Sequence, residues 1–222
     1  MADSSSAPAA PDEPSALRRQ PRQARSQERV RRILEAAEAL FQEEGVGATT
    51  TNAIAARAAV PIGSLYQFFP DKAAILRSLA QRYADRLHEQ LVAFDQGEGK
   101  ELPLEAYIAR IVELTDRFFR DHPGYPAIFM DVQAGSPDLI AIEEEADARL
   151  IADWSGTLVA RAATAGTDLS EEDGRLIATV LVKTIGNLLW LSATQAKAFR
   201  DRLVRETSEL AIAYLRRRIA AT

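Results

Sequence analysis

Cysteine is absent from this chain of 222 residues, and histidine occurs only twice. The absence of cysteine excludes disulfides and thiolate ligands for a metal. His88 and His122 stand far apart in the sequence, so we expect neither a histidine-based metal site nor a Ser-His-Asp triad. The sequence also lacks GxSxG, Gly-rich phosphate-loop and HExxH motifs. These absences predict a protein that is not an enzyme and that has no catalytic residues, no metal and no cofactor.

Long apolar runs are also missing from the sequence. No run approaches the ~18 consecutive apolar residues that a membrane-spanning helix needs. The first residues, MADSSSAPAAPDEP, are polar and lack the apolar core of a signal peptide. We therefore expect a cytoplasmic protein with no membrane partner.

The N-terminal residues 1–24 are rich in Ser, Ala and Pro, a composition that predicts a disordered tail. Four arginines close this segment: Arg18, Arg19, Arg22 and Arg25. They are either solvated or form a basic arm that adds phosphate contacts or enters the minor groove of DNA. Further arginines follow in the next helix and are expected to face solvent: Arg29, Arg31 and Arg32.

Positive and negative residues are distributed unevenly along the chain. The net charge is −5, yet residues 16–78 hold ten Lys and Arg against six Asp and Glu. Both the residues before this segment and those after it are acidic on balance. A basic front on an acidic body would orient the molecule toward DNA and keep the body away from it.

The pattern of apolar residues predicts an all-α protein. No segment alternates between apolar and polar residues as a half-buried strand would. Apolar residues recur instead at spacings of three and four, and Pro, Gly and capping residues divide them into about nine helices. A three-helix domain at residues 25–72, with Ser26 as the expected cap of its first helix, is expected to precede a helical bundle at 73–222. In that bundle we expect helices at about 71–96, 103–121, 126–133, 138–163, 170–193 and 196–219.

The segment 49–72, TTTNAIAARAAVPIGSLYQFFPDK, has the pattern of a helix-turn-helix. Thr50 and Thr51 can cap its first helix through a side-chain oxygen. Leu65 and Phe69 lie four residues apart, so they share the inward face of the second helix. Pro70 disfavours helical geometry before it, which limits the second helix to about seven residues, or ~10 Å. A helix this short fits a major groove ~12 Å wide.

The outward face of the second helix and the two flanking helix starts supply the candidate DNA-binding residues. Asp71 is expected to cap the next helix, which leaves the ammonium group of Lys72 at the rim, where it can meet a phosphate. The full set of predicted DNA-binding residues is Thr50, Thr51, Asn52, Ile62, Gly63, Ser64, Tyr66, Gln67 and Lys72.

This segment resembles the N-terminal domain of the tetracycline repressor family of bacterial regulators. The matching residues are Gly45, Thr49, Thr50, Ile54, Ala55, Ala58, Val60, the run Gly63-Ser64-Leu65-Tyr66 and the run Phe69-Pro70-Asp71-Lys72. The sequence departs from the family at two positions. Ala59 replaces the usual turn glycine, and a left-handed conformation would cost it about 1 kcal/mol. Phe68 replaces a histidine that can bond a phosphate in many members, a contact that phenylalanine cannot make.

The helix expected at 170–193 is apolar on more than one face, so it needs a cover on both sides. The last helix alone leaves part of this surface bare, and the same pair of helices from a second subunit would cover it. The alternative is a core formed within one chain. The resemblance also implies a homodimer through the last two helices. The candidate interface residues are Leu181, Ile185, Leu188, Leu203 and Leu210.

The same resemblance implies a small-molecule effector inside the C-terminal bundle. Large or polar residues that could line its cavity are Tyr107, Phe118, Phe119, Phe129, Met130, Trp154, Asn187 and Trp190. Each could equally be ordinary core. Lys183 could lie in the same region, although a dimer rim is the commoner place for a lysine, and the run Glu143 to Glu145 is expected in solvent. The many aromatic and aliphatic candidates favour an apolar or aromatic effector.

These expectations combine into one functional hypothesis. The protein is expected to be a ligand-responsive, dimeric transcriptional repressor whose partners are a palindromic double-stranded operator and a small-molecule effector. The alternative is an all-helical regulator or interaction protein that does not respond to a small ligand or does not bind DNA.

Overall fold

The structure is a computed structural model that describes residues 19–122, 124, 125 and 137–219. Every regular element in these residues is helical, so the expected all-α class is confirmed. The short helix expected at 126–133 lies outside the described residues. The elements are α1 (Arg19–Glu44), α2 (Thr51–Arg57), α3 (Ile62–Phe68), α4 (Lys72–Gln96), the 3-10 helix η2 (Glu98–Glu101), α5 (Leu104–Asp121), α7 (Pro137–Thr164), α8 (Glu171–Ala193) and α9 (Lys197–Ile219).

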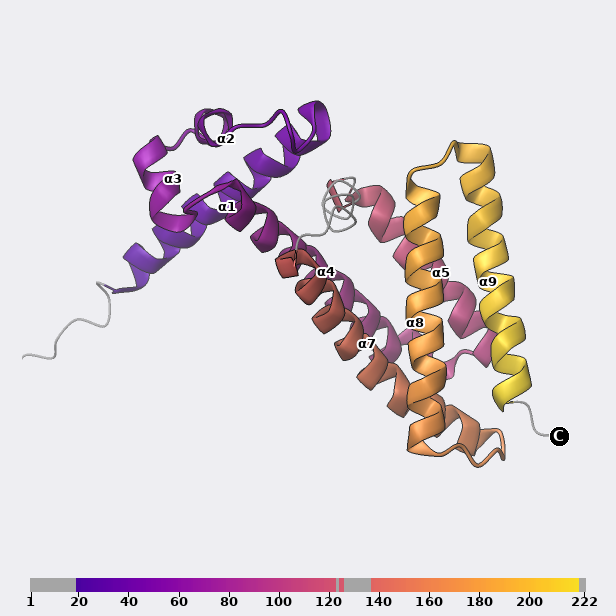
Figure 1. Ribbon diagram of the computed structural model, residues 1–222. Coiled ribbons are helices and arrows are strands. Elements are labelled where there is room, and N and C mark those ends of the chain that lie inside the picture. The colour runs from indigo at the N-terminus through magenta and orange to yellow at the C-terminus, as the bar shows by residue number, and fades with distance from the viewer. Residues whose placement is uncertain (1–18, 123, 126–136, 220–222) are drawn as a thin grey trace, which may run out of the picture.

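Helices α1, α2 and α3 form a small head, and α4 leads from this head into a bundle with α5, α7, α8 and α9 (Figure 1). The head is closed by apolar residues from all three helices, of which Ile33, Ile54 and Leu65 have no exposed surface. Phe69 ends α3 and is also buried, as the four-residue spacing predicts. The hydrophobic contacts of α3 therefore all lie on one side and leave its other side outward.

Helix α1 is longer than the sequence pattern indicates. It begins at Arg19, so Ser26 lies inside the helix and does not cap it. The prediction of a disordered tail is therefore wrong for residues 19–24, whereas residues 1–18 lie outside the described residues. Pro21 is tolerated because it falls in the first turn, where backbone N–H groups have no partner within the helix. At the other end, Gly45 adopts the left-handed conformation of a C-cap glycine, with φ of 83°.

The turn between α2 and α3 is a Schellman motif. The backbone N–H of Ala59 donates to Ala56 and that of Val60 donates to Ala55, which satisfies two carbonyls at the end of α2. This motif requires a left-handed residue, and Ala59 has φ of 51°. The guanidinium of Arg32 from α1 donates to the carbonyls of Ala58 and Ala59 and holds the turn from outside. The strain expected at Ala59 is therefore present, and the turn keeps the geometry that a glycine would give.

Helix α4 connects the two halves without interruption. Asp71 caps it, since its carboxylate accepts the N–H of Ala74 at 2.7 Å, and its 25 residues span about 37 Å. Its first turns bury Ile75 and Leu79 and its later turns bury Leu87 and Leu91. One helix therefore contributes to the packing of both the head and the bundle.

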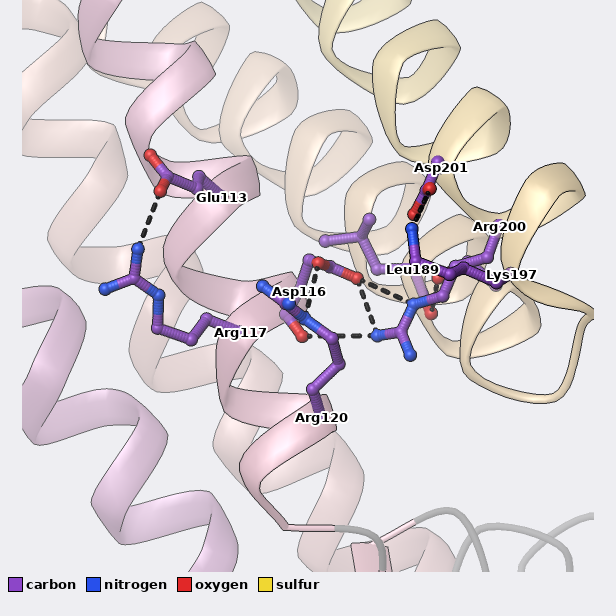
Figure 2. Close-up of polar contacts among 9 residues, drawn as sticks. Glu113, Asp116, Arg117, Arg120, Leu189, Lys197, Arg200 and Asp201 are labelled. Carbon is purple, nitrogen blue, oxygen red and sulfur yellow. Dashed lines mark hydrogen bonds and ion pairs between the residues drawn. The ribbon is translucent and has the colours of Figure 1, made fainter.

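Helix α9 is fixed to α5 by a nearly buried ion pair (Figure 2). Arg200 donates to Asp116 Oδ1 at 2.8 Å through one nitrogen and at 3.2 Å through another, and the side chain of Asp116 is only 12% exposed. Arg120, one turn further along α5, lies 3.1 Å from the second carboxylate oxygen of Asp116. Breaking such a pair would leave a charge with poor access to water, so these residues hold the start of α9 in place.

Helix α8 is, within the described part of the chain, the one helix whose length and composition would suit a membrane span. It packs against α5, α7 and α9 in the bundle. Its apolar character comes from two faces, of which one is buried in the bundle and the other carries the exposed residues Leu176, Val180 and Leu191.

Ala59→Gly should stabilise the protein slightly. Glycine removes the left-handed strain of about 1 kcal/mol or more, whereas its greater freedom in the unfolded chain costs roughly 0.5–1 kcal/mol. We expect a net gain between zero and about 1 kcal/mol in urea unfolding. Ala56→Gly is the matched control, because Ala56 is exposed within α2. It should lose about 1 kcal/mol. Equal losses for both variants would contradict the strain at Ala59.

Candidate DNA-binding surface and effector cavity

The outward side of α3 presents a continuous set of accessible side chains. Ile62, Tyr66 and Gln67 are exposed, whereas Leu65 between them is fully buried. Gly63 is exposed as well, with open space where a Cβ atom would lie, so a close approach to a ligand backbone is sterically free there. This arrangement brings the predicted α3 residues to one accessible surface.

The start of α2 is joined to α3 by side-chain hydrogen bonds. Thr50 Oγ1 accepts the backbone N–H of Ala53 at 3.1 Å, which confirms Thr50 as the cap of α2. Thr51 Oγ1 lies 3.1 Å from the hydroxyl of Tyr66. Asn52 is exposed beside them. The two hydroxyls of Thr51 and Tyr66 therefore form one polar surface across the helix-turn-helix.

Lys72 takes a different position from the one expected. Its ammonium group donates to the carbonyl oxygens of Val46 at 2.6 Å and of Thr49 at 3.0 Å, with Gly47 further away at 3.4 Å. An ammonium has three N–H donors, and all three of these acceptors belong to the segment between α1 and α2. The expectation that the ammonium of Lys72 is free to meet a phosphate is therefore corrected. Lys72 instead binds the first turn of α4 to the segment that precedes α2.

A cavity of about 260 Å³ lies between α4, α5, α7 and α8. Four of the eight residues predicted for it do line it: Phe119, Trp154, Asn187 and Trp190. Much of the remaining wall is aliphatic and includes Leu87 and Leu91 of α4. The volume and the apolar walls suit a small organic molecule.

Two predicted cavity residues are placed elsewhere by the structure. The hydroxyl of Tyr107 donates to Asp95 Oδ1 at 2.8 Å, and its ring stacks on Phe94 beneath the guanidinium of Arg161. Phe118 packs in an aromatic cluster with rings such as that of His122, 4.5 Å away between centroids. Neither ring is part of the cavity wall, to which α5 contributes Ile111, Thr115 and Phe119. Phe129 and Met130 lie outside the described residues.

Two acidic residues in the cavity wall, Glu143 and Asp147, were missed by the sequence reasoning. Glu143 and Asp147 of α7 and Lys183 of α8 all line the cavity, and Lys183 pairs with Asp147. Burial, together with the negative charge of Asp147, raises the pKa of the Glu143 carboxyl. Burial lowers the pKa of Lys183, but its bond to Asp147 and the negative charges of Asp147, Glu143 and Glu144 together outweigh this effect, so the net shift of the pKa is upward.

A signal for these carboxylates was present in the spacing of α7. Glu143 and Asp147 precede Leu150 and Trp154 at steps of four, three and four, which places all of them on one helical face. The expectation that Glu143 faces solvent is therefore wrong, whereas Lys183 lines the cavity and keeps 46% of its side chain exposed.

The predicted dimer residues divide between the interior and the surface of the chain. Leu181 and Ile185 are only 2% and 3% exposed, so they belong to the core of one chain, and their assignment to the dimer interface is corrected. Leu188 and Leu203 are half-buried, whereas Leu210 is 51% exposed. The remaining exposed apolar residues of α8 and α9 escaped the prediction: Leu176, Val180, Leu191 and Phe199.

These exposed residues form one stripe on each helix. On α8, Leu176, Val180 and Leu191 lie opposite the residues that pack into the bundle, and on α9 Phe199 and Leu210 do the same. Helices α8 and α9 run side by side (Figure 1), and both pack on α5. Their buried faces make the contacts with the bundle, so their bare faces lie on the opposite side.

Comparison with known proteins matches both halves of the chain. Residues 33–79 match the profile described as bacterial regulatory proteins, tetR family. Residues 103–215, about half of the chain, match the tetracyclin repressor-like C-terminal domain. The chain belongs to the TetR family of transcriptional regulators. TetR-family proteins are DNA-binding regulators and not enzymes, so the helix-turn-helix is the DNA-binding element of the chain.

Individual relatives agree with this membership. A TetR-family transcriptional regulator from Streptomyces coelicolor is 30% identical, with a TM-score of 0.63 over 85% of this chain and 98% of the other. The chain is 34% identical over 87 residues to the HTH-type transcriptional regulator YxaF of Bacillus subtilis, and this match spans 39% of the chain and 45% of YxaF. The fatty acid degradation regulator FadR from Bacillus halodurans, at 18% identity and a TM-score of 0.66, covers 85% of this chain and 96% of its own and shares the fold.

Glu143→Gln should change the pH dependence of stability. In the unfolded chain the carboxyl titrates near pH 4.5, and in the folded protein its pKa is higher. The folded state then holds more protons above pH 4.5, so the wild type loses stability as pH rises through that interval. The variant avoids this loss, and its advantage in urea unfolding should grow from pH 4.5 upward and then level off. Glu144→Gln, at an exposed neighbour, should follow the wild type, and an advantage of Glu143→Gln that is constant with pH would contradict the burial of Glu143.

Proposed function

We propose that the protein is a dimeric, cytoplasmic transcriptional repressor that binds a palindromic operator and is released by a small molecule in the bundle cavity. The observation that supports this most directly is that α4 contacts both the helix-turn-helix and the cavity. Its first turn is tied to the helix-turn-helix through Lys72, and its later residues Leu87 and Leu91 line the cavity. A ligand that moves the cavity wall therefore acts on the same helix that orients the DNA-binding head.

The accessible surface of the head supports a division of roles in DNA binding. Ile62 and Gln67 project from α3 and would contact base edges in the major groove. Gly63 and Ser64 lie at the start of α3, where the N–H of Gly63 and the hydroxyl of Ser64 would donate to a phosphate, since the N–H of Ser64 is bonded to the carbonyl of Pro61. At the start of α2 and beside it, Thr50, Thr51, Asn52 and Tyr66 offer polar groups for phosphates. Lys72 contributes by fixing the head on α4.

The bare stripes of α8 and α9 support homodimerisation through these two helices. In the family such helices usually form the subunit interface, and two helices from each subunit would give a four-helix arrangement. The Asp116–Arg200 pair keeps α9 in register with α5, and α5 carries the cavity residue Phe119. A two-fold dimer would present two α3 helices about 34 Å apart, which demands a palindromic operator.

The composition of the cavity supports an effector with an apolar or aromatic body. The aliphatic and tryptophan walls would enclose that body. The charged residues of the cavity wall are Glu143, Asp147 and Lys183, so the net charge of the wall is negative when both carboxyls are ionised. This charge favours a hydrogen-bond donor or a cationic group on the effector over a carboxylate.

Binding to DNA is the direct test of the proposal. The full-length protein should shift and footprint DNA from the region upstream of its own gene, with two protected half-sites related by two-fold symmetry. A compound screen should then find molecules that abolish the footprint and that quench the cavity tryptophans. Failure to bind any such DNA at moderate salt would favour an all-helical interaction protein instead, and binding that no compound affects would favour a regulator without a small ligand.

Gln67→Ala should alter sequence preference, whereas Lys72→Ala should weaken binding to every sequence. Removing a base contact costs about 1–3 kcal/mol at one position of the half-site and leaves other positions unchanged. Removing Lys72 frees the segment before α2 from α4, so it should also lower the melting temperature of the head. Binding selection with randomised half-sites distinguishes these results. An unchanged base preference in Gln67→Ala would remove Gln67 from the reading residues.

Leu210→Glu together with Leu176→Glu should convert a dimer into a monomer. Both leucines are exposed in the single chain, so the charges should not disturb folding, but they would be buried without partners in the interface. Sedimentation should fall to the mass of one chain, 24.3 kDa. Ile140→Glu, at an exposed apolar residue on α7, is the matched control and should remain dimeric. A double variant that stays dimeric would place the interface elsewhere.

A further inference from the structure

The first half of α1 carries a stripe of arginines beside the helix-turn-helix. Arg25, Arg29 and Arg32 follow one another at steps of four and three, so they lie on one face of α1. Arg25 and Arg29 are exposed. Both precede residue 33, at which the match to the TetR-family DNA-binding profile begins. This stripe therefore lies outside the part of the head that the family comparison assigns to DNA binding.

Two contacts show where this face of α1 points. Arg32 donates to the carbonyls of Ala58 and Ala59, the residues of the turn that leads into α3. Glu43 lies eleven residues after Arg32, three helical turns further along the same face, and it binds Arg57 of α2. The face is therefore the one that adjoins α2 and the turn. Arg29 is about 4.5 Å and Arg25 about 10.5 Å along the helix axis from Arg32.

The charges along α1 are compensated unequally. Arg31, on another face, binds Glu28 at its Nε and Glu35 at its Nη1, at 2.8 and 2.7 Å. Arg25 and Arg29 have no ion pair or side-chain hydrogen bond with any of the residues that the structure describes. Two exposed guanidinium groups thus remain available for an anion on the side of the turn before α3. The positive charges of Arg25 and Arg29 repel each other on this face, and a bound polyanion would relieve that repulsion.

We propose that Arg25 and Arg29 bind phosphates of the DNA backbone that flank the half-site read by α3. Guanidinium groups bind phosphate oxygens through two parallel N–H bonds. A DNA strand that passes the start of α3 must also pass the turn at Ala59, because the turn leads directly into that helix. The stripe extends from this turn along α1, so it would follow the backbone away from the bases. This contact rests on the proposed DNA binding and adds affinity without sequence preference.

The salt dependence of binding tests this inference. Each phosphate contact contributes about 0.9 to the slope of log affinity against log salt concentration. The double variant Arg25→Gln/Arg29→Gln should therefore reduce the magnitude of this slope by about 1.8 for each subunit, or about 3.6 for a dimer on a complete operator. The measurement is fluorescence anisotropy of the full-length protein with an operator duplex, in a series of potassium chloride concentrations. The base preference of the double variant should equal that of the wild type.

Arg31→Gln is the matched control, since it removes an exposed arginine of the same helix whose charge is already neutralised by Glu28 and Glu35. It should keep the wild-type slope, and glutamine keeps the helix propensity at all three substituted positions close to that of arginine. Circular dichroism checks that each variant is folded. A double variant that binds with the wild-type slope overturns the phosphate contacts and leaves the proposed function intact. A wild type that binds no duplex overturns both.

A shorter duplex gives a second, independent readout. When the DNA is cut at the outer edges of the two half-sites, the flanking phosphates are missing. The wild type should then lose affinity and show the reduced slope of the double variant, whereas the double variant should bind long and short duplexes equally. An equal loss in both proteins would show that the flanks are bound by other residues, which would also overturn the assignment to Arg25 and Arg29.

Discussion

The structure depends on one shared helix. Helix α4 buries Ile75 and Leu79 near the head and Leu87 and Leu91 in the bundle, so neither half can pack without it. A continuous helix resists bending, because its backbone hydrogen bonds would have to be broken. Any displacement of its cavity end must therefore be accommodated by rotation or translation of the whole helix. The head cannot remain unaffected, since Lys72 binds the carbonyls that precede α2.

The polar contacts between helices restrict how this displacement can be absorbed. Arg32 holds the turn before α3, and the Asp116–Arg200 pair holds α9 on α5. Each of these contacts joins elements that are distant in sequence, and each uses a guanidinium, whose planar donors define an orientation as well as a distance. These contacts constrain the helices to move together, which is the condition for a change at the cavity to reach the helix-turn-helix.

The sequence predicted the fold further than it predicted the sites. Local signals suffice for helix ends: Thr50, Asp71 and Ser170 each cap the helix that was expected to follow, because a capping oxygen and the N–H that it binds are only three residues apart. The start of α1 was misjudged because Ser26 is a good cap in isolation, and the Pro21 before it is compatible with a first turn. The sequence predicted four of the residues that line the cavity, because they are large, or polar among apolar neighbours: Phe119, Trp154, Asn187 and Trp190. Glu143 was assigned to solvent because its neighbours Glu144 and Glu145 are also acidic.

The sequence by itself determined the membership of the family, the helical class and the short recognition helix, since these rest on spacing and on turn chemistry within a few residues. Only the tertiary structure decided what each face meets. Helix α8 has two apolar faces, and spacing cannot tell which of them α5 covers; packing places Leu181 and Ile185 inside and leaves Leu176 outside. In the same way, the ammonium of Lys72 could reach a phosphate or a carbonyl, and the path of the chain from Val46 to Thr49 brings carbonyls within its reach. Periodicity defines a surface, but the partner of that surface comes from residues far away in the sequence.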